Sequence, residues 1–347
     1  MLQTPMADKP LLTIENMSIS FSSPDEPDIE AVRQVDLTLT PGKTLCLVGE
    51  SGCGKSVTAR AILRLLDKNA KIGTGRILFE EPGGANVDLA ALKPDSLAMR
   101  AVRGNHISMI FQEPMSSLSP VHTIGDQIDE MMVIHEGLKP KQARERTVAL
   151  LDQVGIPGAR ERADAYPFQL SGGLRQRAMI AMALACTPNL LIADEPTTAL
   201  DVTTQAQILD LLRQLQADYG MAMLFITHDL GVVAEIADEV AVMYLGDVVE
   251  QGSVYDVFAS PQHPYTQALM ASIPKMARKA DRVRLSPIKG TVPSPKDRPK
   301  GCAFTSRCPY AFEPCATVTP ERTAVGANHH ARCHLLTRAE TKTEALA

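Results

Sequence analysis

An eight-residue segment at positions 49–56, GESGCGKS, constrains the fold more than any other part of the chain. It fits the pattern G-x-x-x-x-G-K-S and follows the apolar run 44–48, which is typical of a buried parallel strand. In that position the backbone N–H groups of the loop and the N-terminus of a following helix form a phosphate-binding site. A glycine-rich turn without a ligand is the alternative, and it is rare for the complete motif after a strand. We therefore predict a helix from Lys55 to about Leu66, and nucleotide contacts from Gly49, Ser51, Gly52, Gly54, Lys55 and Ser56.

Two side chains of this loop and two carboxylates elsewhere would complete a hydrolytic site. Lys55 is expected to reach the β- and γ-phosphates of ATP, and the Ser56 hydroxyl to ligate Mg²⁺. The apolar run 190–193 delivers Asp194 and Glu195 at its carboxyl end, where open α/β sheets bind ligands. We expect Asp194 to hold Mg²⁺ through water and Glu195 to act as general base on an attacking water. Without the phosphate loop, such a pair would more often be a solvated loop.

Composition excludes several other classes of protein. Hydrophobic residues make up 45% of the 347, enough for a sizeable core, so the chain is not disordered. A net charge of −5, only 4% aromatic residues and no Trp argue against phosphate neutralisation and base stacking, so we expect no nucleic-acid partner. No run approaches 18–20 apolar residues, and residues 1–10 lack the apolar stretch of a secretory signal. We expect a cytosolic protein that works at a membrane only through partners.

Apolar periodicity predicts an α/β fold with a mostly parallel sheet, because buried strands alternate with helices. Ahead of the phosphate loop, two alternating runs predict antiparallel strands joined by the Ser/Pro/Asp-rich loop 22–30. Residues 123–164 have helical periodicity without a strand signal, and we interpret them as a helical insertion. The helices expected at 176–186 and 205–217 precede the strands at 190–193 and 223–227, respectively. A closing hairpin is expected over 240–249, with its turn at Gly246-Asp247. The expected strands are 12–21, 32–39, 44–48, 190–193 and 223–227.

A second anion site is predicted at Ser171-Gly172-Gly173, which opens a helix. Taken alone, this segment would be an ordinary Ser N-cap followed by flexible glycines. Together with the phosphate loop and the Asp-Glu pair, it resembles the signature of ATP-binding cassette (ABC) ATPases, which clamps the γ-phosphate of ATP held by an opposing subunit. Leu174 departs from that pattern, in which Gln is typical. The resemblance implies a P-loop NTPase fold of ABC type, with a RecA-like, mostly parallel core, an antiparallel β piece and a helical subdomain.

Four more positions match landmarks of ABC ATPases. By this resemblance Phe21 stacks on adenine, and Gln112, after the run 108–111, senses Mg²⁺ and the transmembrane partner. Asp201 lies in the segment that meets the other subunit of the dimer. His228, after the run 223–227, contacts the γ-phosphate. The implied cofactors are ATP and Mg²⁺, with Ser56, Gln112 and Asp194 around the metal.

The end of the chain narrows the resemblance. Residues 263–269, HPYTQAL, are similar to the C-terminal motif of ATPase subunits from oligopeptide, dipeptide and nickel importers. We therefore predict a nucleotide-binding domain over residues 11–255, with its helical subdomain at about 113–175, and a C-terminal extension over 256–347. Di- or oligopeptides are the expected cargo, and nickel, oligosaccharides or opine-like solutes are the alternatives.

The resemblance also implies partners: a second ABC ATPase subunit, two transmembrane permease subunits and an extracytoplasmic solute-binding protein. It favours a paralogue over a second copy of this chain as the other ATPase, and it places both at the cytoplasmic face of the bacterial inner membrane. A soluble ABC ATPase that acts on DNA or ribosomes is a weaker alternative. Chromosome-maintenance members separate the two phosphate sites by long coiled coils, whereas Lys55 and Ser171 are 116 positions apart here.

Four cysteines crowd the Pro-rich extension with the spacing C-x5-C-x6-C-x17-C: Cys302, Cys308, Cys315 and Cys333. Thiolates suit zinc or an iron–sulfur cluster, and the spacing is typical of neither, so cluster, zinc and no metal all stay open. The family resemblance favours a [4Fe–4S] cluster. His329, His330 and His334 could replace one ligand of zinc, although we expect them to be solvated loop residues. A segment this rich in Pro cannot build a large core of its own, so it needs either packing against the main domain or a bound metal that cross-links it.

Overall fold

Five adjacent strands of the main sheet are parallel in the computed structural model, which describes residues 9–24, 26–81, 83–112, 117–198, 200–273 and 288–338. The sheet has the order β11-β12-β10-β9-β3-β8-β7-β6. Its central strands are almost wholly buried, which explains why they read as continuous apolar runs. The parallel strands are β3 (Thr44–Val48), β6 (Ile107–Ile110), β7 (Leu190–Asp194), β8 (Ala222–Thr227) and β9 (Glu239–Tyr244), and β10 (Asp247–Ser253) runs antiparallel to β9.

A second, antiparallel sheet has the order β2-β1-β4-β5. Its strands are β1 (Leu12–Ser23), β2 (Glu26–Leu39), β4 (Ala70–Glu80) and β5 (Asn86–Asp88). The expected loop over 22–30 was too long, because the β1–β2 ladder continues through Phe21 opposite Ile29 to Ser23 opposite Glu26. Backbone pairing carries these strands past the point where their apolar alternation stops.

The helices confirm the α/β alternation, with shifted ends. The helix after the phosphate loop ends at Ile62, short of the expected Leu66, and the one expected at Gln176 begins four residues earlier. No helix in the described ranges is both long and apolar enough to cross a bilayer. The helices are α1 (Lys55–Ile62), α2 (Leu97–Val102), α4 (Ile124–Glu136), α5 (Pro140–Gln153), α6 (Ala159–Ala163), α7 (Gly172–Leu184), α8 (Val202–Tyr219), α9 (Leu230–Ile236), α10 (Val254–Ala259), α11 (Pro264–Ala271) and α12 (Glu313–Thr317), with 3₁₀ turns at Leu89–Ala91, Pro167–Gln169 and Pro295–Asp297.

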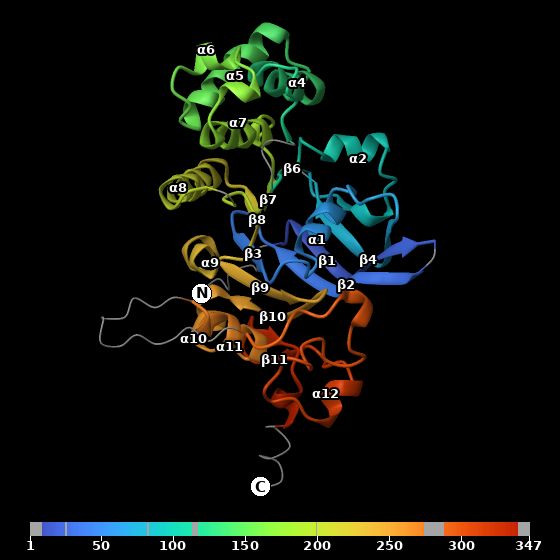
Figure 1. The fold of residues 1–347 in the computed structure, drawn as a ribbon. Coiled ribbons are helices and arrows are strands. Elements are labelled where there is room, and N and C mark those ends of the chain that lie inside the picture. Colours follow the sequence, from blue (N-terminus) through green and yellow to red (C-terminus); the bar gives the residue numbers. More distant parts are fainter. Residues whose placement is uncertain are drawn as a thin grey trace, which may run out of the picture.

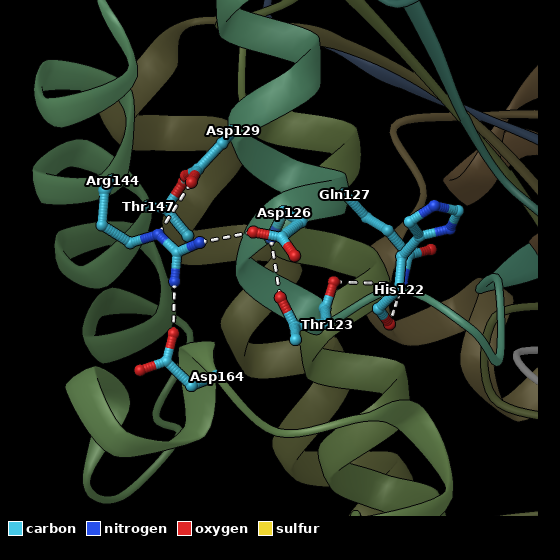
Figure 2. A network of polar contacts seen from close by, with 8 residues as sticks. All are labelled: His122, Thr123, Asp126, Gln127, Asp129, Arg144, Thr147 and Asp164. Carbon is cyan, nitrogen blue, oxygen red and sulfur yellow. Dashed lines mark hydrogen bonds and ion pairs between the residues drawn. The ribbon is translucent and has the colours of Figure 1, made fainter.

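The expected helical insertion is present as α4, α5 and α6, which lie with α7 at the top of Figure 1. One arginine on α5, Arg144, fastens these helices together, as Figure 2 shows. Its guanidinium donates to Asp129 and Asp126 on α4, at 2.7 Å each, and to Asp164 just after α6, at 2.6 Å. The ion pairs of Arg144 therefore stay within the helical region.

The later described part of the extension, residues 288–338, packs directly on the cassette. Strand β12 (His330–Ala331) pairs with β10, and β11 (Thr323–Ala324) pairs with β12, so the extension completes one side of the main sheet. Phe304 is buried against the rings of Tyr244 and Tyr265, with centroids 5.2 and 5.3 Å away. The sequence predicts that this Pro-rich segment needs either packing against the main domain or a bound metal that cross-links it. The structure shows the packing.

Candidate functional site

The phosphate loop connects β3 to α1, and two of its glycines are required by close backbone contacts. Gly49 has a φ of +155°, and a Cβ there would lie 2.1 Å from the Met243 carbonyl oxygen. Gly54 has a φ of +103°, and a Cβ there would lie 2.7 Å from the Ala31 carbonyl oxygen. The loop is thus pressed against β9 and β2, in a shape that a side chain at either glycine would disrupt.

Lys55 is buried beneath the loop. Its ammonium donates to the carbonyl oxygens of Gly49, at 2.8 Å, and Glu50, at 3.1 Å. The next residue, Ser56, donates from its hydroxyl to Asp194 Oδ1 at 2.9 Å, which joins the loop to the end of β7. Burial raises the pKa of Asp194. The Ser56 hydroxyl and the Asp194 carboxylate form a set of oxygens of the kind that Mg²⁺ prefers.

Glu195 lies at the centre of a polar cluster at the carboxyl ends of β6, β7 and β8. Its Oε2 accepts from Gln112 Nε2 at 3.1 Å and from the Thr198 hydroxyl at 2.9 Å, and its Oε1 lies 3.4 Å from His228 Nδ1. The Glu195 backbone has a φ of +48°, which is strained for a residue other than glycine. The structure therefore brings together three predicted residues that are far apart in sequence, along with Thr198, which sequence reasoning missed.

The other predicted nucleotide contacts lie apart from this cluster. Phe21 is half-buried on β1, opposite Ile29 of β2 and Ala70 of β4. Ser171 and Gly172 are exposed at the start of α7, in the helical region at the top of Figure 1, and Gly173 follows them. Their assignment to ATP held by another subunit concerns an assembly and stays a prediction.

Asp201 has a local structural role in this chain. It is the N-cap of α8, and its carboxylate accepts from the Thr204 backbone N–H at 3.0 Å and from the Thr204 hydroxyl at 2.7 Å. These hydrogen bonds lower the pKa of Asp201. Capping alone accounts for an aspartate here, so its predicted place in a dimer interface stays a prediction.

Two of the four cysteines of the extension are linked through the backbone, because the Cys302 N–H donates to the Cys315 carbonyl oxygen at 2.9 Å. Burial is the largest cause of the raised pKa of Cys302, about 12, and the nearby thiols of Cys315, Cys333 and Cys308 raise it further. The backbone two residues further on partly offsets the rise in pKa at three of the thiols: Phe304 at Cys302, Tyr310 at Cys308 and Leu335 at Cys333.

Metal ligation by these cysteines stays a prediction. Within the described residues, no three His, Cys, Asp or Glu side chains are placed to hold one metal ion. The donor set still suits a cluster, because it consists of four thiols.

The expectation of a solvated loop was wrong for His329, which is buried. Its Nε2 lies 2.7 Å from Glu250 Oε1. The same carboxylate accepts the backbone N–H of His263 at 2.8 Å, and His263 Nδ1 accepts the N–H of Tyr265 at 3.0 Å. Burial lowers the pKa of His263 to about 3. The family-like motif over 263–269 is therefore held in place by a buried carboxylate on β10.

Sequence reasoning also missed two ion pairs that join the extension to the cassette, one buried and one with a partly exposed carboxylate. Arg307 contacts Glu50 of the phosphate loop, and Arg298 contacts Asp247 at the start of β10. The partners of the first pair are 257 positions apart, and neither pair belongs to a motif. A pattern within one short segment could not have identified either pair.

Comparisons with known proteins match this arrangement. The family described as ABC transporter matches residues 32–198, and the one described as oligopeptide/dipeptide transporter, C-terminal region, matches residues 249–315. A putative peptide import ATP-binding protein of Brucella ovis is 52% identical over 94% of this chain and 98% of its own. A dipeptide transport ATP-binding protein of Haemophilus influenzae is 47% identical over 93% of this chain and 95% of its own.

Among solved structures, a dimeric ATP-binding cassette in a post-hydrolysis state, bound to ADP and Pi, has a TM-score of 0.61 at 26% identity. The match covers 70% of this chain and 98% of that one. The fold therefore agrees with the sequence matches, which extend over nearly the whole chain. The chain belongs to the ABC transporter family, as an ATP-binding ATPase subunit with the C-terminal region of oligopeptide/dipeptide transporters.

Proposed function

We propose that this protein hydrolyses ATP to drive the import of di- or oligopeptides. The Glu195 cluster carries the ATPase part of the proposal, because it holds a carboxylate beside Gln112 and His228 at the edge of the sheet that also bears the phosphate loop. The cargo rests on the C-terminal region and on the printed names of relatives, which refer to peptide and dipeptide transport.

In this mechanism the phosphate loop binds the β- and γ-phosphates, with Lys55 as the cation beneath them. Ser56, Asp194 and Gln112 would hold Mg²⁺, which neutralises charge on the phosphate oxygens. Glu195 accepts the proton of the attacking water, and Gln112, Thr198 and His228 fix the orientation of its carboxylate. Catalysis then consists of positioning and charge stabilisation, since phosphoryl transfer needs little covalent participation by the protein.

A second ABC ATPase subunit would complete the nucleotide site. In this proposal Ser171, Gly172 and Gly173 contact the γ-phosphate of ATP bound to that subunit, Asp201 lies at the interface, and Phe21 stacks on adenine. The exposed start of α7 supports the first contact, because N–H groups at a helix N-terminus bind anions. The related dimeric cassette bound to ADP and Pi supports pairing of two subunits. We favour a paralogue over a second copy.

The remaining partners are two transmembrane permease subunits and an extracytoplasmic solute-binding protein. The ATPase would bind the permeases at the cytoplasmic face of the bacterial inner membrane. Residues 11–255 would form the nucleotide-binding domain, with a helical subdomain at about 113–175, and 256–347 the extension. Co-purification of permease subunits with the tagged chain, and loss of dipeptide uptake when its gene is deleted, would test the assembly and the cargo.

We further propose that Cys302, Cys308, Cys315 and Cys333 hold a [4Fe–4S] cluster, with zinc as the alternative. The cluster would cross-link segments of the extension. The set of four thiols in one short extension supports the proposal, because thiolates are the usual ligands of iron–sulfur clusters. Anaerobic purification should give about four irons and four sulfides per chain, as expected for one such cluster, and a Cys308→Ser variant should lose them. Zinc, or no metal, in the wild-type protein would contradict the proposal.

The Glu195→Gln variant tests the ATPase mechanism directly. It keeps the size and hydrogen-bonding reach of the side chain and removes the base, so hydrolysis should fall by about a hundredfold or more, while ATP binding is retained. Lys55→Ala is the matched contrast, because it should lose ATP binding itself. Near-normal hydrolysis by Glu195→Gln would show that Glu195 is not the base.

A further inference from the structure

One side chain of the extension reaches into the phosphate loop. Arg307 donates to Glu50 through both terminal nitrogens, NH1 to Oε2 at 2.7 Å and NH2 to Oε1 at 3.1 Å. This two-pronged arrangement is the strongest geometry for a guanidinium and a carboxylate. The Arg307 side chain is 4% exposed, and its guanidinium also lies over the rings of Tyr244 and Phe304. Arg307 is therefore fixed in place by its surroundings.

Glu50 is the one acidic residue in the segment 49–56. A loop that binds a triphosphate gains nothing from a free carboxylate, because the negative charges repel each other. The pair with Arg307 neutralises that charge and holds it on the side of the extension. The backbone of Glu50 is fixed separately, since its N–H donates to the Tyr265 hydroxyl at 3.0 Å and its carbonyl oxygen accepts from Lys55 at 3.1 Å.

We propose that Arg307 is a positioning residue for nucleotide binding: by neutralising and holding Glu50, it lets the cysteine-bearing extension set the affinity of the phosphate loop. The proposal rests on the assignment of residues 49–56 to the nucleotide, made above. Arg307 directly precedes Cys308 in the chain, so a rearrangement of that part of the extension would move the guanidinium away from Glu50. The extension would in this way regulate the ATP site from outside it.

The chain contains a matched control. Arg332 also directly precedes a cysteine, Cys333, and also joins the extension to the cassette. It donates to the Gln34 carbonyl oxygen at 3.0 Å and pairs with Asp36 at 3.6 Å, both on β2 and outside the phosphate loop. Removing Arg332 thus removes an extension-to-cassette contact of the same kind without altering the loop.

The experiment measures Mg-ADP binding to the full-length chain by calorimetry. Arg307→Met should weaken binding about tenfold, the effect of losing one charge-assisted contact. The loss should shrink at high salt, because it arises from the released charge of Glu50. Adding Glu50→Gln to Arg307→Met should restore affinity to within about threefold, and Arg332→Met should stay within about twofold of wild type. In turnover assays the Arg307→Met effect should fall on KM for ATP more than on kcat.

Two results would overturn the inference: unchanged affinity in Arg307→Met, or no recovery in the double variant, since Arg307 would then not act through Glu50. The Lys55→Ala variant distinguishes a failure of the Arg307 inference from a failure of the proposed nucleotide-binding function. If that variant binds Mg-ADP normally, the assignment of the loop is wrong; if it loses binding and Arg307→Met does not, only the role of Arg307 is wrong. Should Arg307→Met fail to fold, Arg307→Gln replaces it: this variant also removes the positive charge, so a similar loss of affinity is expected and an unchanged affinity would equally contradict the inference.

Discussion

The helical region and the extension lie at opposite ends of the molecule in Figure 1, and they are fastened in different ways. In the helical region Arg144 pairs with three aspartates of the same region, and the pairs are partly open to water, with the Asp164 side chain 76% exposed. In the extension Arg298 pairs with Asp247 of the cassette, and both side chains are less than 10% exposed. One region is thus tied to itself, the other to the core.

The difference suggests different mechanical roles. A region whose ion pairs are internal can shift as a body without breaking them, while its apolar residues slide on the core. A region held by buried cross-connections cannot shift without leaving charges unpaired in a low-dielectric interior. We therefore expect the helical region to follow nucleotide and partner binding, and the extension to stay with the sheet. Three measurements test this difference between the two regions.

The largest effect is expected from Arg298→Met. It leaves the buried Asp247 carboxylate without its cation, and breaking a buried pair in this way lowers the free energy of unfolding by about 3 kcal/mol. Urea unfolding at neutral pH measures the change. The double variant Arg298→Met/Asp247→Asn should recover much of it, because no unpaired charge remains. A loss below about 1 kcal/mol, as for a surface pair, would mean that this pair does not fasten the extension.

An intermediate effect is expected from acid. The pKa of His263 is lowered by burial to about 3, so the folded protein leaves it neutral while the unfolded chain protonates it below about pH 6.5. The unfolded state then binds more protons, and the free energy of unfolding falls as pH drops from about 6.5 towards 3, by at most about 1.4 kcal/mol per pH unit. Glu250, which contacts both His263 and His329, is unchanged in the variant described next, so its own contribution cancels in the comparison with wild type.

The comparison is with His263→Asn, whose side-chain oxygen can accept the same Tyr265 N–H. The advantage of wild type over this variant in urea unfolding should shrink as the pH is lowered from 7 to 5. Parallel stability curves for the two proteins would show that His263 does not contribute to acid sensitivity.

The smallest effect is expected from Arg144→Met in the helical region. Partly exposed pairs contribute little, so the free energy of unfolding should fall by about 1 kcal/mol, and by less in 0.5 M salt. Thermal unfolding at two salt concentrations measures both. A loss as large as that of Arg298→Met, or one independent of salt, would remove the distinction between the two regions.

The parts predicted from sequence are those whose signal is local. The phosphate loop, the Asp194-Glu195 pair and the buried strands each occupy one short segment with a fixed spacing or an apolar run. Gln112 and His228 were assigned by resemblance, and the structure places both at Glu195 because parallel strands bring their carboxyl ends to one edge.

The parts that sequence reasoning missed depend on contacts between distant segments. Strand β4 was not predicted because Gly73 and Gly75 interrupt its apolar alternation, and Gly75 packs against the β1 backbone with a φ of +95°. Burial of His329 requires Glu250 on another strand, and the partner of Arg307 is in the phosphate loop. No local pattern encodes such pairs, since each follows from the packing of the whole chain.

The two-residue strand β12 has one more consequence. It covers the outer edge of β10 by pairing at Glu250 and Gln251, and β11, equally short, becomes the outermost strand on that side. An uncovered edge strand offers its free N–H and C=O groups to any other chain, and this is a common start of aggregation. A protein cut after residue 273 would expose β10 in this way. The extension therefore also protects the protein against aggregation, because it prevents β10 from pairing with an edge strand of another molecule.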